Sequence, residues 1–322
     1  MAPPYEKYDP ELAGILAQYD LPGVINDEFV MRQREADKNF DVNMLLEEFP
    51  TLKHEEITIE GANHNRITLS IICSKIKHKA KLPGIYFIHG GGMIFGNRFG
   101  GLHTVLPFVA EHNAVCISVE YRLAPEHGGV AALHDCYDGL LWVGKNLKKL
   151  GINPKKLLIL GRSAGAALAA GTALRMRDRH EGPALRGMVL SFPMLDDRSD
   201  TNSCKEFEDT GPWSRQSNIY AWKHILGPYY GTKSVSSYIA PARETNLSDL
   251  PSAYIDVGTA EIFRDEAWDF AEKLGNAKVN VELKLWEGGY HCFDNAGRTS
   301  QLAQKALDAR FYWMRCTLGL NA

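Results

Sequence analysis

The sequence predicts one α/β domain in which a mostly parallel sheet of about eight strands lies between layers of helices. Two observations predict this fold. Short, wholly apolar segments recur along the chain, as expected for strands that are buried on both faces of a parallel sheet. Helix-length segments separate them, as the crossovers between parallel strands require. Because no internal repeat or low-complexity tract interrupts this alternation, we expect a single domain over residues 1–322.

The elements follow in order along the chain. Residues 1–50 contain amphipathic stretches and no strand signal, so we expect helices there. The segments "EEITIEG" and "RITLSIICS" flank the turn-rich "GANHN", which predicts an antiparallel hairpin. Six further strands are predicted at "GIYFIHG", "AVCISVEY", "LLILG", "GMVLSF", "AYIDVG" and "VELKLWEG". Helices are predicted at 130–150, 163–180, 264–277 and 299–318.

One segment departs from the alternation of strands and helices. Residues 196–250 are rich in polar and aromatic side chains and contain no clear strand. A connection of this length inside a domain is uncommon unless it has a function. We therefore expect residues 1–50 and about 196–250 to form a helical cap over one edge of the sheet. The alternative is a long surface connection.

The composition excludes several classes of protein. The formal net charge is −3, and the lysines and arginines are dispersed, which indicates no nucleic-acid partner. The N-terminal residues are too charged for the apolar core of a signal peptide. No segment approaches the ~20 apolar residues of a membrane span. The cysteines form no CxxC pair, so we expect reduced thiols in a cytoplasmic protein and neither a disulfide framework nor a zinc site. The six cysteines are Cys73, Cys116, Cys136, Cys204, Cys292 and Cys316.

A serine lies between two glycines in "GRSAGA", directly after the apolar segment "LLIL". A sharp turn from strand to helix needs small residues at Gly161 and Gly165, because side chains there would collide. Such a turn holds the central residue, Ser163, in a strained conformation with its hydroxyl exposed. Small residues also follow strands in ordinary loops, so Ser163 is a candidate nucleophile that requires a base and an acid elsewhere in the chain.

Three consecutive glycines end the segment "YFIHGGG". Glycines leave backbone N–H groups uncovered and able to converge on one point, as the oxyanion of an acyl-transfer intermediate requires. The N–H of Ala164, directly after Ser163, is the third donor that we expect. The alternative is a flexible loop, but flexible glycine tracts seldom follow a buried strand.

His291 is the candidate general base among the histidines. It lies in a glycine-rich loop, "EGGYHCF", after the last predicted strand. Loops at strand ends hold catalytic groups in place and leave them accessible. By itself His291 would be assigned to the surface, but the order serine, acid, histidine along the chain favours a catalytic role.

The acid that orients the imidazole is expected after the seventh strand. The candidates are Asp256, Glu261, Asp265 and Glu266. Asp256 lies within the strand and is expected to be structural. Asp265 and Glu266 begin the next helix, where the helix dipole favours carboxylates in any case. Glu261 lies in the loop, from which its side chain can reach His291, so we favour Glu261 over Asp265.

Together these motifs resemble the hormone-sensitive-lipase-like family of α/β-hydrolase esterases. The similarity extends from about residue 50 to the end, and "YRLAPE" beside "HGGG" is far more specific than a serine between glycines. The motifs occur in the family's order: "HGGG" at 89–92, "YRLAPEH" at 121–127, "GRSAG" at 161–165, "GTAEIFRDE" at 258–266 and "GGYHCF" at 288–293.

The resemblance implies an α/β-hydrolase fold and a role for each site residue. It implies Ser163 as nucleophile, His291 as base, and the N–H groups of Gly91, Gly92 and Ala164 as oxyanion donors. It also implies the cap described above, and neither a metal nor a cofactor. In relatives, residues near the last strand build a dimer, so a homodimer is an open expectation here.

The sequence departs from the family pattern at several positions. Arg162 replaces the usual aspartate before the serine, and we expect a structural role because side chains at this position usually support the turn. Ala166 replaces a common glycine. Glu261 followed by Ile262 replaces an Asp-Pro pair, and we expect a Ser–His–Glu triad with a shifted loop.

The segment after "YRLAPE" lacks the prolines that are common in the family, which loosens this loop without affecting the chemistry. In this region Arg122, Glu126 and Asp135 are expected to form a buried ion-pair scaffold rather than to act in catalysis.

The leading hypothesis is a serine carboxylesterase that hydrolyses small to medium esters through an acyl-enzyme. A specialised acetylesterase or lactonase acting on a secondary metabolite would have the same features. The alternatives are a small-molecule receptor on the same scaffold, against which the presence of His291 argues, and a hydrolase of amides or C–C bonds. Aromatic residues of the expected cap indicate an apolar pocket: Phe207, Trp213, Tyr220, Trp222, Tyr229 and Tyr230.

Overall fold

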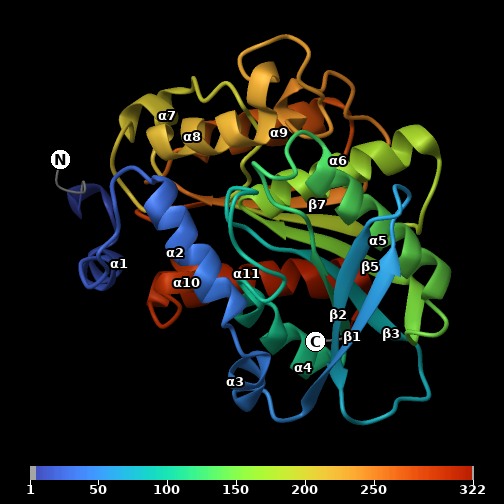
Figure 1. The fold of residues 1–322 in the computed structure, drawn as a ribbon. Coiled ribbons are helices and arrows are strands. Elements are labelled where there is room, and N and C mark those ends of the chain that lie inside the picture. Colours follow the sequence, from blue (N-terminus) through green and yellow to red (C-terminus); the bar gives the residue numbers. More distant parts are fainter. Residues whose placement is uncertain (1–4, 321–322) are drawn as a thin grey trace.

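Eight strands form one sheet in the computed structural model of the chain, which describes residues 5–320 (Figure 1). The strand order is β1-β2-β4-β3-β5-β6-β7-β8. The strands are β1 (Leu52–Glu60), β2 (Arg66–Ser74), β3 (Leu82–Ile88), β4 (Val115–Glu120), β5 (Ile152–Arg162), β6 (Gly187–Ser191), β7 (Ser252–Gly258) and β8 (Val281–Trp286). All eight coincide with predicted segments, so the predicted α/β architecture is confirmed.

Only β2 runs against the rest of the sheet, because it is antiparallel to both of its neighbours, β1 and β4. β1 pairs antiparallel with β2 from Leu52 opposite Ser74 to Glu60 opposite Arg66, as predicted for the hairpin. β2 is antiparallel to β4, and β3 to β8 are parallel to one another. The carboxyl ends of the parallel strands therefore meet at one edge. Because β4 and β5 lie on opposite sides of β3, the chain reverses its direction of winding there, where open α/β sheets place their ligand sites.

The helices predicted from the sequence are also present. The described α-helices are α1 (Pro10–Leu16), α2 (Asp27–Lys38), α3 (Val42–Glu47), α4 (Leu106–His112), α5 (Ala131–Asn146), α6 (Ala164–Arg179), α7 (Asn202–Glu206), α8 (Arg215–Leu226), α9 (Arg264–Asn276), α10 (Phe293–Ala296) and α11 (Gln301–Leu318). The four predicted between or after the strands are α5, α6, α9 and α11. α4 was not predicted, because it is only seven residues long, too short for a clear helical period.

Successive side chains of the central strands point to opposite faces of the sheet and pack in two hydrophobic layers, one on each face. On β3, Tyr86 packs in the layer that contains α5, α6 and α9, whereas the next residue, Phe87, packs in the layer that contains α4 and α11. In Figure 1 α6 and α11 accordingly lie on opposite sides of β7.

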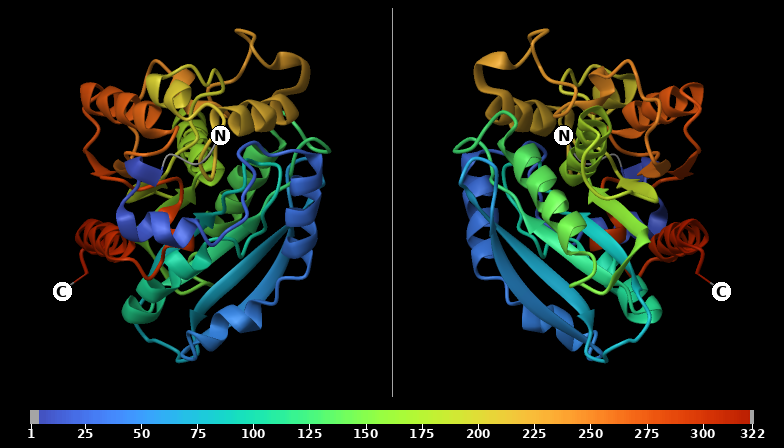
Figure 2. Two further views of the ribbon diagram at one scale, coloured as in Figure 1. Left: turned by 90° about the vertical axis from the view of Figure 1, so that its left-hand side faces the viewer. Right: turned by 90° about the vertical axis from the view of Figure 1, so that its right-hand side faces the viewer.

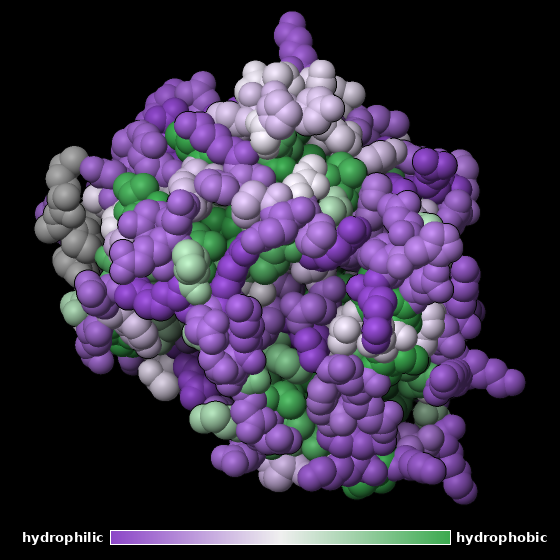
Figure 3. Space-filling view, viewed as in Figure 1, coloured by the Kyte–Doolittle hydropathy of each residue, from purple (hydrophilic) through white to green (hydrophobic). Residues whose placement is uncertain are grey.

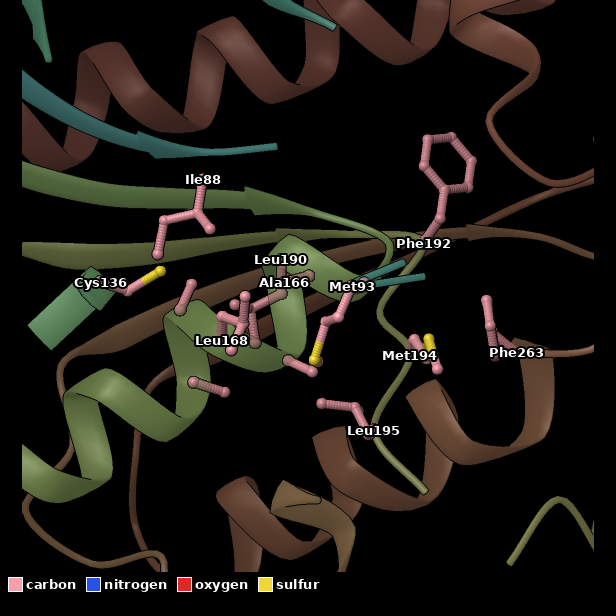
Figure 4. Close-up of a cluster of buried hydrophobic side chains, with 14 of the residues drawn as sticks. Ile88, Met93, Cys136, Ala166, Leu168, Leu190, Phe192, Met194, Leu195 and Phe263 are labelled. Atoms are coloured by element: carbon pink, nitrogen blue, oxygen red, sulfur yellow. The ribbon is translucent and has the colours of Figure 1, made fainter. Parts of the chain in front are cut away.

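Small residues bring α6 close to the sheet directly after Ser163. Ala166 is fully buried, and in Figure 4 it lies near Leu190 among the apolar side chains around α6. At Gly165 a Cβ atom would lie 2.2 Å from the carbonyl oxygen of Ile88 on β3. This close approach fixes the first turn of α6 against the carboxyl edge of the sheet.

The N-terminal segment passes beside α7 and α8 before α2 begins, whereas α3 lies at the opposite end of the molecule (Figures 1 and 2). Lys7 forms an ion pair with Glu206 at 2.8 Å, and the Ile25 N–H donates to Oγ of Ser217 at 3.1 Å. The Arg34 guanidinium donates to the carbonyl of Ile94, just after the HGGG segment, at 2.7 Å. The two segments of the expected cap therefore contact each other and the carboxyl edge; residues 1–4 lie outside the described residues.

The expected scaffold of Arg122, Glu126 and Asp135 is only half correct. Arg122 binds the buried carboxylate of Asp135 with two nitrogens, each at 2.9 Å. Glu126 is not part of this pair: its side chain is 58% exposed, and it binds Arg34 of α2 at 2.7 Å. The position of α2 decides this contact, and the local sequence does not reveal it.

The face seen in Figure 1 is mostly hydrophilic, and hydrophobic residues reach it as separate small areas (Figure 3). Across residues 5–320, no helix has both the length and the apolar character that crossing a membrane requires.

Candidate active site

The turn at Ser163 has the geometry that the sequence predicts. Ser163 follows β5 with φ 53° and ψ −121°, a conformation that is strained for a side-chain-bearing residue. A Cβ atom at Gly161 would lie 2.1 Å from the carbonyl oxygen of Gly165, so neither glycine tolerates a side chain. The Ser163 N–H donates to the carbonyl of Ser191 on β6 at 2.8 Å, which ties the turn to the neighbouring strand.

The structure brings the three expected triad residues into one chain of contacts. Nε2 of His291 lies 2.9 Å from Oγ of Ser163. Nδ1 of the same ring lies 2.6 Å from Oε2 of Glu261. All three side chains are buried, and they come from the ends of β5, β7 and β8. The arrangement is that of a nucleophile, a base and a carboxylate that orients the base.

Glu261 is held for this contact by the backbone of its own loop. Its Oε1 accepts a hydrogen bond from the N–H of Gly258 at 3.1 Å, which leaves Oε2 for His291. The competing carboxylates have other partners. Asp265 accepts from the N–H of Ser203 at 2.7 Å. Glu266 accepts from the N–H of Leu195, and Asp256 binds Arg310 within the core, as expected for a structural residue.

The surroundings of His291 favour its charged form. Burial alone would lower the pKa of His291, but the Cys292 sulfur and the Glu261 carboxylate favour the imidazolium and raise this pKa above its ordinary value. Aromatic rings enclose the imidazole: Phe263 lies edge-on with its centroid 5.0 Å away, and Phe192 lies edge-on at 5.8 Å. The histidine is accordingly only 8% exposed.

The expected oxyanion donors lie on both sides of Ser163. Gly91 and Gly92 have positive φ values of 104° and 60°, which favour glycine. Within residues 5–320, no acceptor binds the N–H of Gly91, Gly92 or Ala164. A Cβ atom at Gly90 would lie 3.3 Å from Cβ of Ser163, so the glycine segment passes directly beside the serine. These N–H groups are therefore free to receive an oxyanion there.

The serine and the histidine open into a cavity of about 360 Å³. This volume lies at the lower end of the ~300–1,000 Å³ of small-molecule sites. The two cap segments contribute Leu16, Leu21, Gln33, Asp37, Pro212 and Trp213. The strand ends contribute Gly90, Gly91, Gly92, Phe95, Gly96, Gly100, Gly101, Arg162, Ser163, Tyr290, His291, Cys292, Asn295 and Ala296.

Of the six cap aromatics named from the sequence, Trp213 lines this cavity. Its ring lies against the oxyanion segment: a Cβ atom at Gly92 would be 2.7 Å from it. Trp222 and Phe207 are buried in the hydrophobic core instead, and Tyr229 is exposed. An aromatic composition therefore indicated a pocket but did not identify the residue that lines it.

Two residues near His291 have contacts that the sequence did not predict. The sulfur of Cys292 lies 3.5 Å from Nε2 of His291, and Asp294 binds Arg162. Their only sequence signal is proximity to the histidine, which does not specify which way a side chain points. In the part of the chain from residue 5 to 320, no group of His, Cys, Asp or Glu side chains is arranged to hold a metal ion.

Most of the chain is similar to known proteins. Residues 85–295 match the family described as alpha/beta hydrolase fold. The carboxylesterase NlhH of Mycobacterium tuberculosis is 31% identical over 240 residues, which cover 73% of each chain. Esterase LipI of the same organism is 31% identical over 205 residues, which cover 64% of this chain and 63% of LipI.

A solved structure extends the similarity to nearly the whole chain. The bacterial heroin esterase superposes with a TM-score of 0.90 at 30% identity, covering 98% of this chain and 99% of that one. Its match includes the regions of both expected cap segments, because only a few residues remain outside it.

Proposed function

The chain belongs to the alpha/beta hydrolase fold family, in its hormone-sensitive-lipase-like branch, and from this premise we propose that it is a serine carboxylesterase whose triad is Ser163, His291 and Glu261. The observation that carries the proposal is the unbroken chain of contacts from Oγ of Ser163 through His291 to Glu261.

The first half of the reaction forms an acyl-enzyme. Oγ of Ser163 attacks the ester carbonyl carbon while its proton passes to Nε2 of His291. The carbonyl oxygen becomes an oxyanion, which the N–H groups of Gly91, Gly92 and Ala164 stabilise; one such donor is worth about 3–4 kcal/mol. The C–O bond to the alcohol then breaks, and His291 gives its proton to the leaving oxygen.

The second half hydrolyses the acyl-enzyme. Water attacks the carbonyl carbon and loses a proton to His291, the oxyanion forms again at the same donors, and the bond to Ser163 breaks with return of the proton to Oγ. Glu261 holds the ring in the tautomer that accepts at Nε2 and stabilises the imidazolium in both halves.

The cavity supports esters of small to medium acyl chains. Its volume is about 360 Å³, and Trp213 stands directly over the oxyanion segment. We propose that residues 1–50 and about 196–250 act as the cap of this cavity, since Leu16, Leu21 and Trp213 line it. One sheet carries every strand among the described residues, which supports the proposal of a single domain over 1–322.

Two broader properties belong to the same proposal. The six cysteines are free thiols, which supports work in the reducing cytoplasm. β8 is an edge strand, with Leu285 exposed on it, and supports a homodimer formed through this edge. Light scattering of the purified chain tests the dimer.

The test of the activity uses p-nitrophenyl esters of increasing acyl length, with the wild type and Ser163→Ala. We expect turnover that is highest for short and medium chains and that is lost in Ser163→Ala. A fluorophosphonate probe should add one covalent group to Ser163, detectable by mass spectrometry of the intact chain. Absence of the adduct would refute the esterase and favour the receptor. Faster turnover of anilides than of matched esters would assign an amidase instead.

A further inference from the structure

The residue before the nucleophile, Arg162, is a buried cation. Its side chain is 4% exposed, and a guanidinium in such a place is costly unless it is paired. Both terminal nitrogens bind one carboxylate: Nη1 lies 2.8 Å from Oδ2 of Asp294, and Nη2 lies 2.6 Å from Oδ1. Nη1 also donates to Oγ1 of Thr104 at 3.2 Å. The bidentate geometry fixes the orientation of both side chains.

Asp294 belongs to the turn that carries the base. It lies three residues after His291, and the turn between them is closed by the Phe293 N–H on the carbonyl of Tyr290 at 3.1 Å. The next bond runs from the Asn295 N–H to the carbonyl of Cys292 at 2.9 Å. Cys292 itself has a positive φ of 56°. A displacement of Asp294 would therefore move His291 with it.

The ion pair thus joins two segments that are 132 positions apart in the sequence, one residue from the nucleophile and three residues from the base. A second contact links the same two segments through Phe192. The Arg162 guanidinium lies 5.5 Å from the ring centroid of Phe192, and that ring packs edge-on against His291 and Phe293. Figure 4 shows Phe192 at the end of its strand, beyond α6.

The pair has a partner on its far side. Arg310 of α11 lies 2.9 Å from Oδ2 of Asp294 and 2.7 Å from Oδ2 of Asp256. The two cations and two carboxylates balance in charge. Burial opposes ionisation of Asp294, but Arg162 and Arg310 outweigh it and hold the pKa of this carboxyl well below its ordinary value. Without Arg162, Asp294 would still be paired with Arg310.

We propose that Arg162 and Asp294 are positioning residues, whose bidentate ion pair holds the His291 turn in register with the Ser163 turn. Neither residue touches the reacting atoms; they act by keeping Nε2 of His291 within reach of the Ser163 hydroxyl. This inference rests on the proposed function. Arg162, which stands where the family usually has an aspartate, therefore forms an ion pair with Asp294.

The test variant is Arg162→Met, which removes the ion pair between residues 162 and 294 but leaves Asp294 bound to Arg310. We expect kcat for p-nitrophenyl butyrate to fall roughly 10- to 100-fold, as for a reacting group displaced by about 1 Å. KM should change less than about twofold, because Arg162 is the only residue of the cavity lining that changes and its side chain is almost fully buried. The rate of covalent labelling by the fluorophosphonate probe should fall with kcat, since both steps need His291 to take the serine proton.

The matched control is Arg122→Met. Arg122 makes the same two-nitrogen contact with a buried aspartate, Asp135, which keeps the Asn65 amide and a backbone N–H as partners. We expect a comparable loss of thermal stability and no change in kcat. Arg162→Lys keeps the charge but not the bidentate geometry, and its kcat should lie between those of the wild type and Arg162→Met.

Three outcomes overturn the proposal: an unchanged kcat in folded Arg162→Met, a loss no larger than that of Arg122→Met, or a loss confined to KM. If Arg162→Met does not fold, full kcat in Arg162→Lys overturns it. Failure of the proposed function is separate, because it would appear as activity that survives Ser163→Ala.

Discussion

The sulfur of Cys292 lies 3.5 Å from Nε2 of His291. The same nitrogen lies 2.9 Å from Oγ of Ser163, so the thiol stands next to the proton path of the proposed reaction. Cys292 is partly exposed and lines the cavity, which makes it accessible to small reagents.

We expect methyl methanethiosulfonate to inactivate the wild type, because a methylthio group on Cys292 would occupy the space beside Nε2. Cys292→Ser should retain activity and resist the reagent. Cys316→Ser, which removes the exposed thiol of α11, should stay as sensitive as the wild type. Residual activity against reagent time measures this, and equal inactivation of Cys292→Ser would contradict the assignment.

The pH dependence follows from the raised pKa of His291. Burial opposes the imidazolium, but Cys292 and Glu261 favour it, so the pKa lies above the ordinary 6.5. Because the base must be neutral to take the serine proton, kcat/KM should be high above this pKa and fall as the pH drops through it. A profile of log kcat/KM against pH should place the acid limb above pH 6.5.

Glu261→Gln provides the companion measurement. The amide cannot stabilise the imidazolium, so the acid limb should move to lower pH and kcat should fall by up to about 10⁴-fold. Asp265→Asn, four positions later, should leave the pH of the acid limb and kcat unchanged. An acid limb at the same pH in the wild type and Glu261→Gln would show that Glu261 does not act on His291.

Trp213 is expected to set the acyl-chain preference. Its ring lies against Gly92 and 6.2 Å from the ring centroid of Phe95, at the wall of the cavity. Trp213→Ala should enlarge the cavity and move the best p-nitrophenyl ester to a longer chain. Trp222→Ala, in the buried core of α8, should cost about 3–5 kcal/mol of unfolding free energy without moving the chain-length optimum. If the best acyl-chain length of Trp213→Ala were the same as that of the wild type, this role would be refuted.

Gly165→Ala is expected to be destabilising, because the new Cβ would lie 2.2 Å from the carbonyl oxygen of Ile88 and 2.3 Å from that of His89. Backbone atoms of a central strand cannot move aside, so we expect a loss of about 3 kcal/mol or more in urea unfolding. Gly14→Ala on α1 meets no atom within 4 Å and should be neutral or stabilising by up to about 1 kcal/mol. Equal midpoints for the two variants would argue against the tight turn.

Periodicity and glycine patterns along the chain predicted most of the fold. Apolar segments such as "LLILG" are buried on both sheet faces, and this requirement leaves its signal within a few consecutive residues. α4 left no such signal because seven residues make only two turns of helix. The turn at Ser163 was predictable for the same local reason. A side chain at either of its glycines would collide with backbone atoms within four positions or on the adjacent strand.

The sequence by itself determined the strands, the main helices, and the identity of the serine and histidine turns, because each depends on contacts between near neighbours in the chain. Only the tertiary structure shows that His291 contacts Glu261 and that Asp265, four positions later, has a different partner, since this depends on which carboxylate the His291 loop meets. It also decided the partners of Arg162 and Glu126, which are Asp294 and Arg34. Such pairs form between segments about a hundred residues apart, where side-chain direction depends on how whole elements pack.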